Sequence, residues 1–364
     1  MRRRDRGCNA PRFFLAAQVI RVTHAHSRAN RFPHSKILSQ SDRGARAAFR
    51  RASRRFSDIG TLSLYYNPTA KPLPLSWIFK LFRTLTRSES AAAAVRTLSL
   101  DLMLVQKSIQ LKASHDLICK AMKSLPLLTT LKLHFVDGLP GRESQLLRDC
   151  HFPRLQGLAI SYPSQEQNAA LYRFLSRHPT ISTLNIHRCH NPSSFDLSEE
   201  YHSTLVMPSL VDFDGDPDWL AAIVPNGKLE GLGVRRWRGH DDVLPSSPGV
   251  FEMIANHART SKESIKIFKA FSFSWDTRLV SLCGECSGLA TLMITVNNDH
   301  TLDCQDFMRT FEREVLPSMK RLISIYIFQH SFESSSPSKL EELRTICRWE
   351  AVCPTLCAIK ISSA

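Results

Sequence analysis

The chain has 364 residues, more than a typical single compact domain, and its 48 Lys and Arg against 33 Asp and Glu give a net charge of +15. No apolar run approaches the ~18–20 residues that a membrane-spanning helix needs, so we expect no membrane protein. Residues 1–56 hold fourteen Arg and one Lys but only two acids, so they carry +13 and the rest of the chain +2. The main domain is therefore nearly neutral, and we expect it not to bind nucleic acid.

We divide the chain into residues 1–46, 47–94 and 95–364. The first region is rich in Arg, Ser and Ala. Three interpretations stay open for it: a mitochondrial transit peptide, a disordered basic tail, or upstream sequence translated from a mispredicted gene start. The ten scattered Cys show no disulfide framework, which suits a cytoplasmic or nuclear protein. A transit peptide would make the location mitochondrial instead.

A short pattern recurs from residue 95 to the C-terminus. Residues 125–133 (LPLLTTLKL) show it most clearly, as a Leu-Pro pair followed by apolar residues at every second place. One apolar anchor per copy falls at positions 95, 128, 155, 181, 210, 229, 265, 289, 319 and 356. The spacings scatter around the roughly 20–29 residues of a leucine-rich repeat. The pattern predicts an α/β fold, an irregular leucine-rich-repeat solenoid with parallel strands on its concave face. The alternative is an ordinary α/β domain with several buried strands.

Helices are expected on the convex face of this solenoid, between the strands. Apolar residues recur at helical spacing in residues 109–122, 168–175, 307–315 and 340–349. Each of these segments would return the chain from the end of one strand to the start of the next.

Three segments resemble a known family. Residues 47–59 (AAFRRASRRFSDI), 77–82 (WIFKLF) and 95–100 (VRTLSL) are similar to fungal, basidiomycete-type F-box proteins with degenerate leucine-rich repeats. The resemblance covers about residues 47–364, with 47–94 as the remnant of an F-box tail and an N-terminal cap. It implies a non-enzymatic substrate receptor of a cullin ubiquitin ligase. The Leu-Pro and apolar helix that dock the ligase adaptor do not precede residue 47, so the resemblance implies target recognition without assuring adaptor binding.

No segment predicts a catalytic site, a cofactor or a metal centre. Cys283 and Cys286 have C-x-x-C spacing, but no second pair completes a zinc site, so we interpret them as buried thiols. Residues 212–218 (DFDGDPD) resemble the start of a calcium loop, yet Pro217 and Ile223 stand where that loop needs Gly and Glu. Residues 235–240 join basic and aromatic side chains as single-strand binders do, but two Asp follow and offset them.

The concave face is the predicted binding surface, because strand side chains alternate and a solenoid aligns the outward ones on one sheet. We assign partner binding to ten outward positions: Lys132, His134, Asn185, His187, Asp212, Asp214, Arg235, Lys269, Thr291 and Tyr326. The sequence thus predicts a protein-interaction scaffold and no enzyme, without identifying the partner. The alternative is a mitochondrial or nucleic-acid-associated repeat protein that uses the basic N-terminus. A hydrolase would need converging His and carboxylate groups that the spacing does not predict.

Overall fold

The computed structural model describes residues 61, 64–67, 75–101, 111–134, 142–162, 167–188, 205–223, 228–235, 252, 254–257, 259, 265–273, 277–286, 288–297, 308–330 and 339–363. The chain divides into two compact units, Met1–Ser63 and Leu64–Ala364. The predicted region 1–46 and the F-box-like segment 47–59 lie outside the described residues. All helices and strands given below belong to the second unit.

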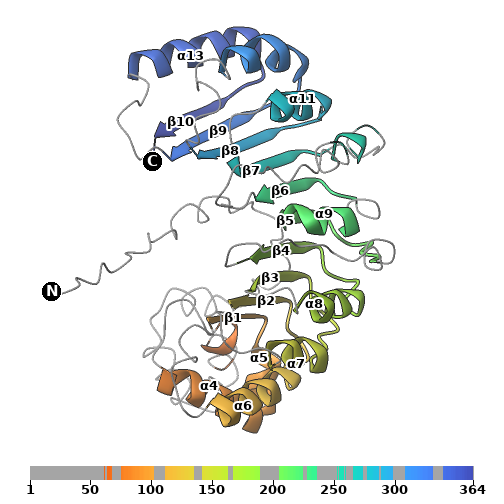
Figure 1. The fold of residues 1–364 in the computed structure, drawn as a ribbon. Helices are drawn as coiled ribbons and strands as arrows, with labels where there is room; N and C mark the ends of the chain where they lie inside the picture. Colours follow the sequence, from red (N-terminus) through yellow and green to blue (C-terminus); the bar gives the residue numbers. More distant parts are fainter. Residues whose placement is uncertain are drawn as a thin grey trace, which may run out of the picture. The chain divides into compact units, whose positions relative to one another are not determined.

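In the described part of the second unit, ten strands form one sheet (Figure 1). They are β1 (Thr97–Asp101), β2 (Thr130–His134), β3 (Gly157–Tyr162), β4 (Thr183–Arg188), β5 (Asp212–Gly215), β6 (Gly231–Arg235), β7 (Ile267–Phe273), β8 (Thr291–Asn297), β9 (Ser324–His330) and β10 (Ala358–Ser363). Every strand pairs in parallel with the next one in sequence, from β1 to β10. A doubly wound α/β domain would reverse this order at a switch point. The unbroken order is that of a solenoid, in which each unit adds one strand beside the last.

Alternating side chains explain why these segments are strands. In β2, Leu131 and Leu133 are fully buried while Lys132 between them is exposed. The residue just before each strand also joins the sheet through its backbone. At one end of this ladder the Thr129 N–H donates to the Arg96 carbonyl at 2.8 Å. At the other end the Cys357 N–H donates to the Ile323 carbonyl at 2.8 Å. The sequence repeat therefore corresponds to a repeat of backbone hydrogen bonds.

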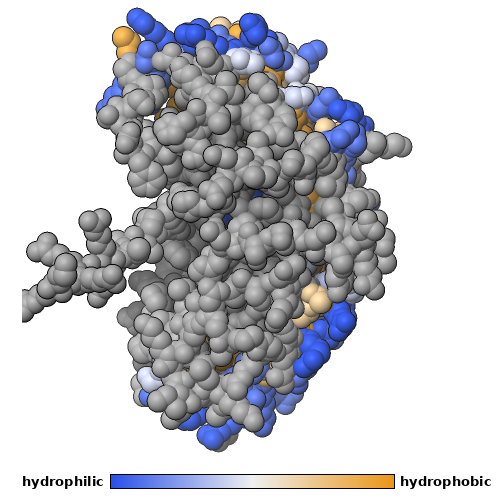
Figure 2. Space-filling view, viewed as in Figure 1, coloured by the Kyte–Doolittle hydropathy of each residue, from blue (hydrophilic) through white to orange (hydrophobic). Residues whose placement is uncertain are grey.

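The helical segments lie on one side of the sheet (Figure 1). They are α4 (Leu75–Arg87), α5 (Glu89–Ala94), α6 (Leu111–Lys123), α7 (Arg142–Asp149), α8 (Gln167–Ser176), α9 (Pro217–Ile223), α11 (Thr277–Glu285), the π-helix η5 (Phe311–Val315), the 3-10 helix η6 (Leu316–Ser318) and α13 (Lys339–Val352). The predicted helices at 109–122, 168–175 and 340–349 are confirmed as α6, α8 and α13. The apolar stripe of α8, which consists of Leu171, Phe174 and Leu175, is buried, whereas α13 buries Trp349. The surface over α13 is mainly hydrophilic (Figure 2). Leu340 and Leu343 of this helix are exposed.

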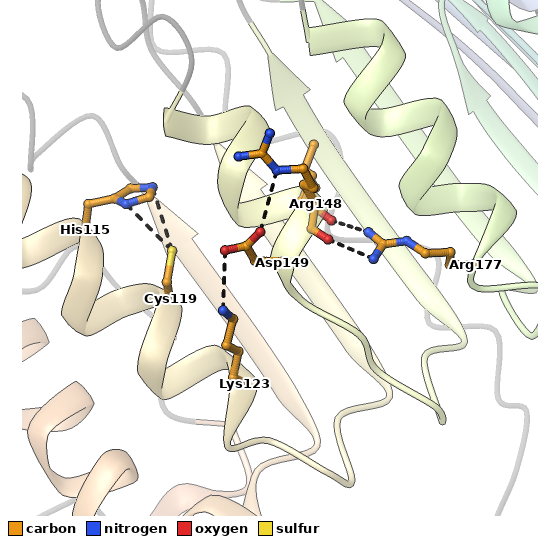
Figure 3. A network of polar contacts seen from close by, with 7 residues as sticks. His115, Cys119, Lys123, Arg148, Asp149 and Arg177 are labelled. Carbon is orange, nitrogen blue, oxygen red and sulfur yellow. Dashed lines mark hydrogen bonds and ion pairs between the residues drawn. The ribbon is translucent and has the colours of Figure 1, made fainter.

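Polar contacts join successive helices away from the sheet (Figure 3). Lys123 at the end of α6 pairs with Asp149 at the end of α7, with Nζ 3.3 Å from Oδ2. Arg177, just after α8, donates from Nη1 to the Arg148 carbonyl at 2.8 Å and from Nη2 to the Leu147 carbonyl at 2.6 Å. These carbonyls in the last turn of α7 have no partner within their own helix, and a cation there also suits the helix dipole. Arg177, which follows α8, thereby caps the C-terminus of α7 in the preceding repeat unit.

A buried histidine connects the same units at the start of their strands. His178 is 1% exposed, its Nε2 accepts from the Phe152 N–H at 2.9 Å, and its Nδ1 lies 2.6 Å from the Phe174 carbonyl. The ring also stacks on the Phe174 ring at 4.1 Å. This arrangement requires the neutral tautomer with its proton on Nδ1. Burial lowers the pKa of His178 to about 4, which keeps the neutral form at neutral pH.

The structure corrects one anchor of the predicted repeat. Residue 319 was assigned as the ninth anchor, but the register pairs Thr291 with Ser324, so Leu322 takes the place that Leu289 has in the preceding unit. Pro317 resembles the proline that precedes other anchors, yet it belongs to η6 and the strand starts later. With this correction the last two spacings become 33 residues (289 to 322) and 34 residues (322 to 356).

Candidate protein-interaction surface

The side of the sheet opposite the helices carries every second strand residue, and we call it the outer face. The strand register aligns its side chains in rows that run across the strands. The middle row consists of Ser99, Lys132, Ala159, Asn185, Asp214, Gly233, Lys269, Met293, Tyr326 and Lys360. The rows on either side start in β1 at Thr97 and at Asp101, which pairs with His134 of β2.

All ten residues predicted for partner binding lie on the outer face. Five belong to the middle row, His134, His187 and Arg235 lie in the row towards the strand ends, and Asp212 and Thr291 lie in the row towards the strand starts. They do not form one compact site. Lys132 in β2 and Tyr326 in β9 are seven strand steps apart, or about 33 Å. The face is therefore a surface with several zones.

The central zone contains an ion pair between adjacent strands. Arg235 Nε lies 3.0 Å from Asp214 Oδ1, and the Arg235 guanidinium also lies 4.7 Å from the centre of the Phe271 ring. The Asp214 side chain is 13% exposed. Its burial alone would raise its pKa, but the charge and the hydrogen bond of Arg235 lower the pKa below its usual value. Asp214 therefore stays ionised, and Arg235 is held over the aromatic ring.

Two glycines make room for the acids of this zone. The register places Gly231 opposite Asp212 and Gly233 opposite Asp214. A Cβ at Gly233 would lie 2.8 Å from Asp214 Cγ, and one at Gly231 would collide with Asp212 Oδ1. The two carboxylates thus lean over the backbone of β6, where only glycine fits. The sequence carries one signal of this arrangement that was not used above, namely two glycines at the outward positions of a strand that follows two outward acids.

The adjoining strand β4 offers polar atoms that the described residues leave unsatisfied. Asn185 Oδ1 and His187 Nδ1 are buried and make no hydrogen bond within the described part of the chain. Burial, and secondly the charge of Arg235, lowers the pKa of His187 to about 4, so its ring is neutral. Buried polar atoms are nearly always hydrogen-bonded in native proteins. These two atoms therefore need hydrogen-bond partners that the described residues do not supply.

The cysteines and acids that the structure describes form no metal site. No group of three or more His, Cys, Asp or Glu within the described residues is arranged to hold a metal ion. Cys283 and Cys286 are 1% exposed, and burial raises the pKa of both, that of Cys286 to about 12. Their interpretation as buried thiols is confirmed. Residues 212–218 form strand β5 and the start of α9, and residues 236–240 lie outside the described part.

No described helix is both long enough and apolar enough to span a membrane. No protein-family model matches the chain, and neither does any curated protein. Among solved structures, a chain in the crystal structure of the complex of Rad7 and Elc1 in yeast is similar, with 12% sequence identity and a TM-score of 0.43. The similarity covers 90% of this chain and 87% of that chain.

Proposed function

We propose that this chain is a non-enzymatic leucine-rich-repeat protein that binds another protein on its outer face. The observation that carries the proposal is the set of polar, charged and aromatic side chains that the strand register aligns on one side of the sheet. The helices and the buried apolar residues of the strands described above lie on the other side of the sheet. Aligned strand positions on a repeat scaffold are a natural surface for a protein ligand.

The chemistry of the face supports a protein ligand. Both charge signs occur, with Asp212 and Asp214 between Lys132 and Lys269, so the face has a pattern and no single-sign field. Electrostatic patterns of this kind select partners by matching charges and by rejecting wrong ones. Asn185 and His187 add directional hydrogen-bonding groups beside the ion pair.

The proposal is tested by affinity purification of a C-terminally tagged chain, followed by mass spectrometry of the recovered proteins. The triple variant Lys132→Glu, Asn185→Arg and Asp212→Lys should lose the proteins that the wild-type chain recovers. The matched control is Lys120→Glu, because Lys120 is exposed on helix α6, on the other side of the sheet. Equal recovery with the triple variant and the wild-type chain, both folded by circular dichroism, would refute binding on this face.

A more specific proposal is that the bound protein is a target for ubiquitination. It is supported by the resemblance of residues 47–59, 77–82 and 95–100 to F-box receptors. Residues 77–82 lie in helix α4, and residues 97–100 lie in strand β1. Recovery of a cullin and its adaptor in the same purification is the expected result. Recovery of mitochondrial proteins with a chain cut near residues 30–55 would favour the alternative that the basic N-terminus directs the protein to mitochondria.

A further inference from the structure

The last four strands give the outer face a distinct apolar patch. The register aligns Lys269, Met293, Tyr326 and Lys360 in one row across β7–β10, and Phe271 with Phe328 in the next row. We call these six residues the aromatic patch. The side chains of Phe271, Met293, Tyr326 and Phe328 are partly exposed, although the residues on the opposite side of the same strands are almost fully buried.

The composition of the aromatic patch is that of a binding site. Aromatic residues and Met are enriched at the centres of protein interfaces, where they supply large contact area at low entropic cost. Two cations, Lys269 and Lys360, belong to the patch, and a third, Arg235, lies beside it. Arg235 lies over Phe271, Lys360 Nζ lies 5.4 Å from the centre of the Phe328 ring, and Lys269 occupies the row beside Met293. The strands β7–β10 contain no Asp or Glu.

We propose that the aromatic patch binds an extended acidic segment of a partner protein, with an apolar anchor between two acids. Lys269 and Lys360 are three strand steps apart, which is about 14 Å. An extended chain advances about 3.3 Å per residue, so residues four apart are about 13 Å apart and point to the same side. The geometry therefore fits an acid, any residue, an apolar residue, any residue and a second acid. The two acids meet Lys269 and Lys360, and the apolar anchor lies on Met293 and Tyr326.

Single-stranded nucleic acid fits the same surface less well. Such strands also stack on aromatic rings and need cations, but they carry a phosphate at every nucleotide. Across about 14 Å the row offers cations only at its two ends. Asp212 and Asp214 lie on β5, two strands from β7, and their negative charges act on Lys269. A segment with two spaced carboxylates matches this distribution, whereas a continuous polyanion meets repulsion at one end.

The inference deepens the proposed function and rests on it, because it names the chemistry of the bound segment. The test uses the full chain and phage that display Gly-Glu-Ser-Phe-Ser-Glu-Gly in several copies, since avidity makes a weak contact measurable. The charge-reversed phage displays Gly-Lys-Ser-Phe-Ser-Lys-Gly, and the apolar control replaces Phe by Ser. The wild-type chain should retain the acidic, Phe-containing phage about tenfold better than either control phage.

Charge exchange provides the sharpest comparison. The variant Lys269→Glu with Lys360→Glu should lose about tenfold in retention of the acidic phage and gain about tenfold for the lysine phage. Tyr326→Ser should weaken retention of both. Lys120→Glu, on helix α6 on the other side of the sheet, is the matched control and should bind as the wild-type chain does.

The inference is overturned if the charge-exchanged variant retains the acidic phage as well as the wild-type chain does. Equal retention of all three phages would overturn it as well. If the chain shows no preference for the acidic phage and oligodeoxythymidine displaces the bound phage, the surface binds nucleic acid instead. The proposed function is judged separately. If the triple variant at Lys132, Asn185 and Asp212 loses its recovered proteins while no phage binds, protein binding stands and only the acidic segment is refuted.

Discussion

Acidification should weaken the solenoid through His178, and the size of the effect follows from its pKa. The pKa of this side chain is about 4 in the folded chain and about 6.5 in the unfolded chain. Between these values the unfolded chain binds more protons, so the free energy of unfolding falls as the pH falls. The contribution of His178 is complete above pH 6.5 and is lost as the pH falls towards 4. Between pH 7.5 and pH 5.5 the loss is about 1.4 kcal/mol, and at pH 4 it reaches about 3 kcal/mol.

The contribution of His178 can be separated from those of the other titrating groups by substitution. His178→Gln should lower stability at pH 7.5 by about 1–3 kcal/mol, because it disturbs the buried bonds to Phe152 and Phe174. The same variant should lose about 1.4 kcal/mol less than the wild-type chain when the pH falls from 7.5 to 5.5. The assay is urea unfolding followed by circular dichroism at both pH values.

A control in the same turn distinguishes proton linkage from general weakening. Thr180 donates from Oγ1 to the Leu155 carbonyl at 2.7 Å and does not titrate. Thr180→Val should therefore cost about 1 kcal/mol equally at both pH values. If the stability curves of wild type and His178→Gln run parallel between pH 7.5 and 5.5, the reasoning about a buried neutral His178 is wrong.

Three further substitutions test individual contacts. Gly233→Ala places a Cβ 2.8 Å from Asp214 Cγ and should lower the free energy of unfolding by about 1–3 kcal/mol in thermal unfolding. Its control is Gly284→Ala in helix α11, where the new Cβ would meet nothing within 4 Å, and this substitution should be neutral or stabilise by up to about 1 kcal/mol. Equal effects of the two substitutions would contradict the steric argument. Arg235→Met leaves the Asp214 carboxylate unpaired and should lower the free energy of unfolding in urea by about 1–2 kcal/mol at pH 7. The loss should be smaller near pH 4, because the unpaired carboxylate then becomes protonated. A loss that does not change with pH would count against the ion pair. Arg177→Met removes two hydrogen bonds to the last turn of α7 and should cost about 1 kcal/mol by chemical denaturation; an unchanged midpoint would show that the cap contributes nothing.

Alternation made the strands and the outer face predictable. Once Leu131 and Leu133 are buried, Lys132 must point the other way, and the same parity applies in every unit. The ten proposed binding positions therefore fall on one face as expected. The anchor at residue 319 was wrong because Pro317 has the spacing of the other prolines but lies inside the 3-10 helix η6. The strand register depends on pairing with β8, which the local sequence does not show.

Contacts across strands were beyond the sequence argument. Asp214 is aligned with Gly233 in the register, and Arg235, its ion-pair partner, lies two residues further along β6. The ion pair forms because Gly233 has no side chain to fill the space between Asp214 and Arg235. This space exists only once β5 and β6 are paired in the sheet. The burial of His178 likewise depends on Phe152, 26 residues earlier, which becomes a neighbour only in the stacked solenoid.

Site-specific photo-crosslinking tests protein binding on the outer face most directly. A benzophenone amino acid would replace Lys132 or Tyr326 on the outer face, and Lys120 or Arg344 on helices α6 and α13 as controls. Each chain would be irradiated in cells and the covalent adducts identified by mass spectrometry. We predict adducts with the same protein from both outer-face positions and from neither helix position. Adducts from the helix positions alone would contradict the account, because they would place the partner on the opposite side of the sheet.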